Sequence, residues 1–269
     1  MNHLSWIHRD NHPGLYFDCL VQIFIGDTDV CRCLTSIARS IALAAQVRLR
    51  SEMLHGSSNG LLDLLMQAAS HPSLHICGIA LEAFHPLITP ETDVSIRLLP
   101  VLQGKAIVPP DLVGFTTNSD CGIDLNEFER LREYLLSEVL LACYISNRSY
   151  YIDSCVSAIE EFCTAPISPQ LPYQLEAALF CLSAISVDAS KRALLVTASP
   201  AAQAVALRAC TTRYGRDSKI NESNISQDAK RHDELLAKCI RSIASSPSVA
   251  SSNPLSLSQM CRFIGKVRI

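Results

Sequence analysis

The chain has 269 residues, 48% of them hydrophobic, which is enough to build one large or two ordinary domains with a sizeable core. No apolar run reaches the roughly 18 residues of a membrane span, so the composition argues against an inserted protein. The formal net charge is −3, with 9 Lys and Arg against 15 Asp and Glu in 1–135, and 14 against 11 in 136–269. A free nucleic-acid-binding protein would show a concentrated basic stripe, and no direct nucleic-acid site is evident.

Helical periodicity runs along the chain and strand patterns are nearly absent, which predicts an all-α fold. Short turns with proline separate the periodic segments, and proline is well tolerated in the first turn of a helix. About eleven helices are expected, at 14–25, 29–54, 60–70, 73–88, 93–107, 124–146, 148–164, 172–187, 200–213, 226–245 and 254–267.

Two stretches interrupt this rhythm. The segments 109–123 and 214–227 are rich in turn formers and polar residues, so we expect them to be exposed loop insertions. Neither resembles a linker that would divide the chain into domains.

The segment 172–187, PYQLEAALFCLSAISV, is apolar on nearly every side. A helix of this kind must be buried, because both of its faces need cover. Helical hairpins stacked into an α-solenoid of the HEAT or armadillo kind would supply it, since each hairpin contacts the one before and the one after. We therefore predict a single α-solenoid segment over 1–269, although a closed helix bundle is the competing all-α arrangement.

The twelve cysteines are scattered through helix-like segments, and no CxxC pair occurs. In an intracellular chain such residues act as small buried hydrophobes, so neither zinc fingers nor thiol redox sites are expected. The first residues lack the basic and apolar blocks of a signal peptide, which indicates the cytoplasm or nucleus.

Two short patterns invite a catalytic or metal-binding interpretation. The sequence 56–60 matches GxSxG, with Ser58 as the nucleophile, but that motif works only between a strand and a helix, and the preceding residues are predicted to be helical. His71, His75 and Cys77 lack a metal-binding pattern. No phosphate-binding glycine loop is present. We expect no cofactor and no enzyme, and keep a serine hydrolase as the remote alternative.

One acidic cluster is the candidate partner-binding surface. It comprises Asp120, Asp124, Glu127, Glu129 and Glu133. These acids could simply complement a helix dipole and continue along a solvated face, which is the interpretation we favour. They could instead attract a basic segment of a partner protein.

Several segments resemble the central repeats of the importin-β superfamily, the nuclear transport receptors. They are HPSLHICGIALEAFHPLI (71–88), RLLPVLQGKAIVPPD (97–111), DLNEFERLREYLLSEVLLACY (124–144), YQLEAALFCLSAIS (173–186) and NPLSLSQMCRFIGKV (253–267). The order and spacing are most similar to the transportin-SR and importin-thirteen branch, with the exportins next.

This resemblance implies a HEAT-repeat segment of a longer transport receptor, without catalytic residues. It implies cargo as the partner, with the Ran GTPase and Phe-Gly nucleoporins as partners of a full-length version. Such a receptor works by differential binding, because its ligands favour different curvatures of the solenoid. The alternative is a generic HEAT-repeat scaffold in another cytosolic complex.

Overall fold

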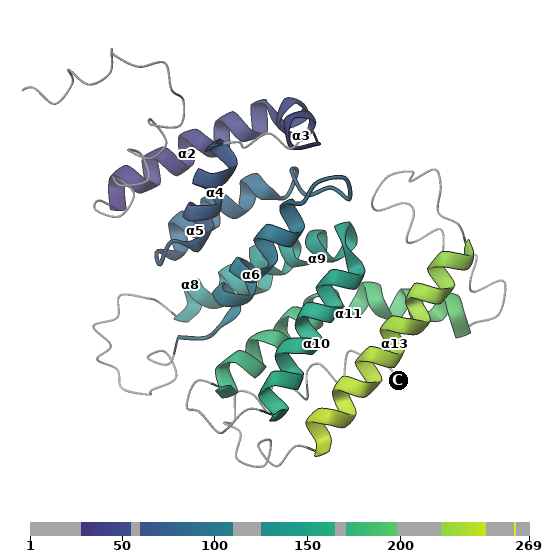
Figure 1. Cartoon of the computed structure of the whole chain (residues 1–269). Coiled ribbons are helices and arrows are strands. Elements are labelled where there is room, and N and C mark those ends of the chain that lie inside the picture. The colour runs from purple at the N-terminus through teal and green to yellow at the C-terminus, as the bar shows by residue number, and fades with distance from the viewer. Residues whose placement is uncertain are drawn as a thin grey trace, which may run out of the picture. The chain divides into compact units, whose positions relative to one another are not determined.

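The computed structural model describes residues 28–54, 60–109, 125–164, 171–197, 222–245 and 261. Every regular element within these ranges is a helix, so the predicted all-α class is confirmed for the part of the chain that the structure describes. The chain separates into two compact units, Met1–Leu87 and Ile88–Ile269. Figure 1 shows the described helices.

The first unit contains four described helices, α2 (Thr28–Ala44), α3 (Gln46–Leu54), α4 (Gly60–Ser70) and α5 (Leu74–Phe84). Helices α2, α4 and α5 pack against one another. Arg39 on α2 pairs with Glu82 on α5, and Nε of Arg50 donates to the carbonyl of Pro86 at 2.9 Å. These contacts tie α2 and α3 to the end of the α5 segment.

The second unit opens with α6 (Val94–Ala106) and a continuous helical run made of α8 (Leu125–Arg130), the π-helical turn η1 (Leu131–Leu136) and α9 (Ser137–Ser146). Ser146, the last residue of α9, donates to the hydroxyl oxygen of Ser95 in the first turn of α6 at 3.2 Å. Because α6 and α9 pack together and the end of one meets the start of the other, they run antiparallel.

Three longer helices follow in the described part of this unit, namely α10 (Arg148–Thr164), α11 (Leu171–Thr197) and α13 (Glu222–Ser245). Tyr151, near the start of α10, donates its hydroxyl to the carbonyl of Cys181 on α11 at 2.8 Å, and only residues 165–170 connect the two helices. Tyr151 and Cys181 both lie several turns from the short connection, and they still touch. The two helices therefore lie side by side and form an antiparallel hairpin.

Two ion pairs fix the direction of α13 relative to α10. Arg231 lies 3.1 Å from Asp153, and Lys238 lies 2.5 Å from Glu160. Both partners advance by seven residues from one pair to the next, which is about two turns of each helix. The helices α10 and α13 therefore run parallel, with α11 packed against both.

The helix with two apolar faces is covered on both of them. Helix α11 packs against α6, α9, α10 and α13. The buried side chains lie around most of its circumference, at Leu175, Glu176, Ala177, Ala178, Leu179, Cys181, Leu182, Ser183, Ile185 and Ser186. This confirms that the segment 172–187 is a buried helix.

The helices at 60–70 and 148–164 have the predicted bounds. The predicted helix 29–54 instead bends at Ala45, although Ala45 N–H still donates to the carbonyl of Ile41 at 2.8 Å. Helix α11 continues ten residues past the predicted end at 187, to Thr197. This continuation contains good helix formers and no glycine or proline.

The predicted loop at 214–227 is partly wrong, because α13 begins at Glu222 rather than at 226. The predicted helices 14–25 and 200–213 lie outside the described residues, and of the predicted helix 254–267 only residue 261 is described. Residues 110–123 and 214–221 of the two predicted loops also lie outside the described residues.

Most described cysteines lie in the core as free thiols. The buried ones are Cys31, Cys77, Cys143, Cys155, Cys181 and Cys239. Burial raises the pKa of Cys143 to about 12, because removal from water disfavours the thiolate. The predicted role of cysteine as a small hydrophobe is confirmed at these positions, whereas Cys33 and Cys261 are exposed.

We predict that stability falls as the pH rises above about 9, the ordinary value for a thiol. The unfolded chain then loses thiol protons that the folded chain retains, so the free energy of unfolding decreases with pH. Urea unfolding in reductant from pH 8 to 10.5 measures this decrease, which Cys143→Ala should reduce by about 1 kcal/mol per pH unit. Cys33→Ala, at an exposed thiol, is the control, and equal slopes for both variants would contradict the prediction.

Candidate partner-binding site

The described acids of the predicted surface all face solvent. Glu127 and Glu129 lie on α8 and Glu133 on η1, and each is exposed. Asp120 and Asp124 lie outside the described residues. The structure thus places three of the five acids on one helical run.

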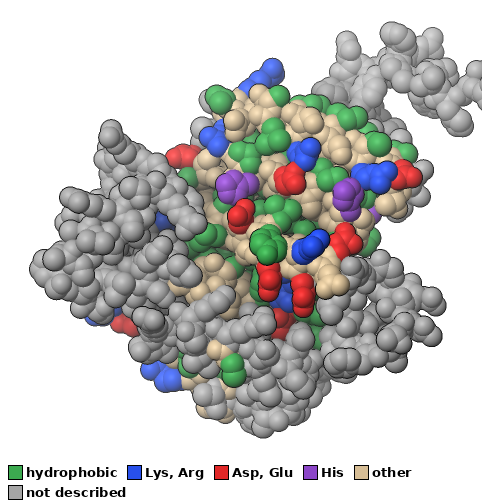
Figure 2. Space-filling view, turned by 180° about the vertical axis from the view of Figure 1, so that it is seen from behind, with side chains coloured by type: hydrophobic (Ala, Val, Ile, Leu, Met, Phe, Trp, Pro, Cys, Tyr) green, Lys and Arg blue, Asp and Glu red, His purple; other side chains and the backbone are tan. Residues whose placement is uncertain are grey.

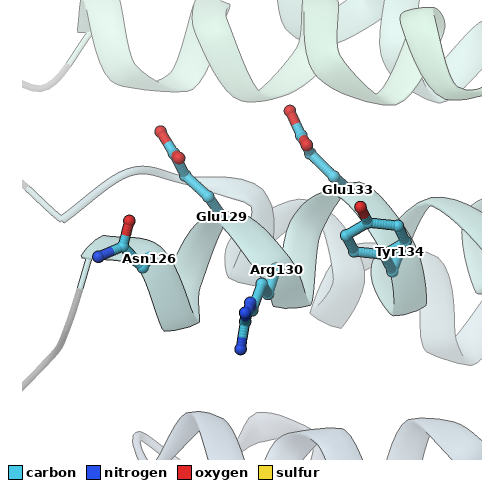
Figure 3. A pocket seen from close by; sticks show the side chains of 5 residues that line it. All are labelled: Asn126, Glu129, Arg130, Glu133 and Tyr134. Atoms are coloured by element: carbon cyan, nitrogen blue, oxygen red, sulfur yellow. The ribbon is translucent and has the colours of Figure 1, made fainter.

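Two of these acids line a surface hollow of about 460 Å³. Its other lining residues are Asn126, Arg130 and Tyr134 (Figure 3). The carboxylates of Glu129 and Glu133 extend from the same side of the helix in Figure 3, whereas Arg130 points to the other side. Tyr134 is 71% exposed, which is unusual for so large a ring. The hollow therefore offers two carboxylates and an accessible aromatic ring.

The π-helical turn positions this surface. The N–H of Ser137 donates to the carbonyl of Arg132, five residues earlier, and also to that of Tyr134. The Ser137 hydroxyl donates to the carbonyl of Glu133 at 2.6 Å. A π-turn widens the helix by one residue and is often found at functional sites. Here it leaves Glu133 and Tyr134 exposed while the preceding side chain, Arg132, is buried.

Arg132 forms a buried ion pair directly beneath this exposed turn. Its Nη2 donates to both carboxylate oxygens of Glu176 on α11, at 2.9 and 3.0 Å. The guanidinium carbon lies 4.2 Å from the ring centroid of Phe180 and 5.5 Å from that of Phe128. The buried cation is therefore held by a buried carboxylate and by two aromatic rings, of which Phe128 is buried and Phe180 partly exposed.

This pair was missed by the sequence analysis, although the sequence contains a signal for it. Arg132 lies on the apolar stripe of its helix, with Phe128 and Leu136 on the turns before and after. Glu176 lies on a helix that is apolar on every other side. Charged residues are almost never fully buried unless they are paired, so two opposite charges on apolar faces predict a partnership.

The GxSxG match and the histidine–cysteine pattern form no catalytic or metal site within the described residues. Ser58 lies outside them, and the segment before it forms helix α3 rather than the strand that a nucleophile elbow requires. His71 lies in the turn before α5, where its Nδ1 accepts from the N–H of Ser73 at 3.1 Å. His75 is exposed on α5 and Cys77 is buried. Across the described parts of the chain, no group of three or more His, Cys, Asp or Glu could hold a metal ion.

Charge is mixed on one face of the part of the chain that the structure describes. Figure 2 shows acidic, basic and hydrophobic side chains interspersed on one face, with no broad area of a single sign. Any electrostatic attraction from the acidic side chains is therefore local, within roughly 10 Å at moderate salt.

No family model, curated protein or solved structure matches this chain. Among the described helices, none is both long and apolar enough to cross a membrane.

We predict that the Arg132–Glu176 pair is essential for stability of the second unit. Arg132→Met should lower the free energy of unfolding by about 3–5 kcal/mol, because it leaves a buried carboxylate without its cation. Urea denaturation followed by circular dichroism gives this value.

The double variant Arg132→Met/Glu176→Leu should be more stable than Arg132→Met, since neither charge then remains buried. Arg130→Ala, at the exposed neighbouring position, is the matched control and should change stability by less than about 0.5 kcal/mol. A single-variant loss no larger than that of Arg130→Ala would show that the pair contributes little.

Proposed function

We propose that this chain is an α-solenoid segment of a nuclear transport receptor of the importin or exportin type, which binds cargo protein and acts in the cytoplasm and nucleus. Its mechanism is binding rather than catalysis. Stacked helical hairpins offer an extended surface whose shape recognises a partner, and a change in curvature couples one ligand to another.

The packing of α13 against both members of the α10–α11 hairpin is the main observation in favour of this proposal. In a solenoid each new hairpin packs against the one before it. Two ion pairs between α13 and α10 belong to this packing.

The repeat motif quoted from the sequence also acquires a physical role. In YQLEAALFCLSAIS, Glu176 binds Arg132 and Phe180 stacks against the same guanidinium. Both motif residues thus connect α11 to the helical run α8–η1–α9 of the preceding hairpin. Contacts of this kind fix the stacking of one hairpin on the next and therefore the curvature of the segment.

The acidic hollow on α8 and η1 is the proposed contact for a basic segment of the cargo. Exposed Glu129 and Glu133 can each accept hydrogen bonds from a lysine or arginine side chain. Tyr134 adds a ring face on which a guanidinium can stack. The buried Arg132–Glu176 pair holds this turn in place.

We expect that reversing the two charges, in Glu129→Lys/Glu133→Lys, weakens binding of an arginine- and lysine-rich peptide by about tenfold at low salt. Fluorescence anisotropy with a labelled peptide at 50 and 300 mM salt measures the effect. The difference between variant and wild type should shrink at high salt, because ions screen exposed charges.

The matched control is Glu161→Lys combined with Glu138→Lys, which changes the net charge equally at exposed positions on α10 and α9. This control should retain the wild-type affinity to within about twofold. Equal weakening by both double variants would mean that only net charge matters, and the hollow would not be the contact site.

The transport assignment has its own test. The longest version of the chain that its gene encodes should bind immobilised Phe-Gly repeats and Ran loaded with GTP, whereas repeats with Phe replaced by Ser should not retain it. Surface plasmon resonance detects both interactions. Complete absence of both would exclude the transport receptor and leave the generic helical scaffold.

A further inference from the structure

Helix α3 buries little of its surface. Of its side chains that the structure describes, at residues 46–51, Leu49 is the buried one, and Val47 is 77% exposed. Arg50 adds a second attachment, because its Nε and Nη2 both donate to the carbonyl oxygen of Pro86. A helix of nine residues is too short to be stable in water without packing. We therefore expect α3 to open locally more often than the longer helices of the chain.

Ser51 lies on this helix directly after the sequence Arg48-Leu49-Arg50. The side chains of Arg48 and Ser51 are both exposed. Protein kinases select their substrates by the charges around the acceptor hydroxyl. One broad class of serine/threonine kinases binds an arginine three residues before the acceptor, through charge-assisted hydrogen bonds from the guanidinium to acidic side chains. Arg48 supplies that arginine for Ser51.

Burial separates Ser51 from the other described hydroxyl with the same pattern. Among the residues that the structure describes, an arginine precedes a serine or threonine by three positions at Thr35 and at Ser51. Thr35 is completely buried on α2, and its hydroxyl donates to the carbonyl oxygen of Cys31 at 2.7 Å. A kinase can therefore reach Ser51 in the folded chain but not Thr35.

We infer that Ser51 is a phosphorylation site for a serine/threonine kinase that recognises arginine. In this reaction the Ser51 hydroxyl oxygen attacks the γ-phosphorus of ATP, the bond from that phosphorus to the β-phosphate oxygen breaks, and ADP leaves. The hydroxyl proton passes to the catalytic aspartate of the kinase. The inference rests on α3 and its sequence, and it is independent of the proposed transport function.

The weak attachment of α3 gives the kinase its access. A kinase binds the acceptor segment as an extended chain, whereas Ser51 lies in a helix, so the reaction proceeds from the fraction of molecules in which α3 has opened. The phosphate then adds a charge of about −1.5 to −2 next to Arg48 and Arg50. It thereby neutralises the positive charge of this short helix.

Incubation of the full chain with ATP and purified calmodulin-dependent protein kinase, which binds arginine at this position, tests the site. Phosphopeptide mass spectrometry should find Ser51 modified at least about tenfold faster than Thr35, because Thr35 is buried. Arg48→Gln should slow the modification of Ser51 by at least about tenfold, since the recognised guanidinium is lost. The matched control Arg32→Gln, at the exposed arginine three residues before Thr35, should leave the rate at Ser51 within about twofold of wild type.

A synthetic peptide of residues 44–55 separates recognition from access. Phosphorylation of the peptide without phosphorylation of the folded chain would show that α3 stays closed, and would overturn the inference. Failure of both substrates, or equal rates at Ser51 in wild type and Arg48→Gln, would show that the arginine is not recognised and would also overturn it. Equal modification of Thr35 and Ser51 would mean that the kinase acts on unfolded chains, so the site on α3 would again be rejected.

Discussion

The buried pair between Arg132 and Glu176 is the interaction on which the second unit depends. Neither charge can remain in the core alone, because an isolated buried ion costs several kcal/mol even after relaxation. Each therefore fixes the position of the other, and Phe128 and Phe180 enclose the guanidinium from the two helices involved. The consequence is a defined register between the run α8–η1–α9 and the start of α11. Apolar contacts alone would tolerate several registers at similar cost.

The same pair connects the core to the candidate binding surface. Arg132 lies within the π-turn, and residues 133 and 134 immediately follow it on the outside. Burial of one side chain thus determines the direction of its neighbours, so the acidic hollow is held by the core rather than by contacts among its own exposed side chains. An exposed carboxylate pair gains little stability by itself. Because buried residues hold the backbone of this surface, the surface can keep its shape while its exposed side chains remain available to bind a partner.

The packing of the long helices bears on the proposed function of this surface. Helix α11 is covered on both faces, and α13 runs parallel to α10 and packs against α11 as well. The α10–α11 hairpin thus gives α13 two helices to pack against, and a solenoid of the kind we propose would repeat this packing from one hairpin to the next. In such a fold, recognition comes from the shape and charge of an extended surface rather than from a deep cavity. This favours a binding protein in our proposal.

The sequence alone determined the all-α class of the described residues, the positions of most helices and the burial of 172–187, because these follow from helical periodicity and from the cover that apolar faces require. It also placed Glu127, Glu129 and Glu133 on a solvated helix face, and the structure has them exposed. The pairing of Arg132 with Glu176, the π-turn and the direction of α13 were decided only by the tertiary structure, since each depends on residues that are distant along the chain. Periodicity states which side of a helix is buried, but the partner that buries it is selected by packing and charge in three dimensions.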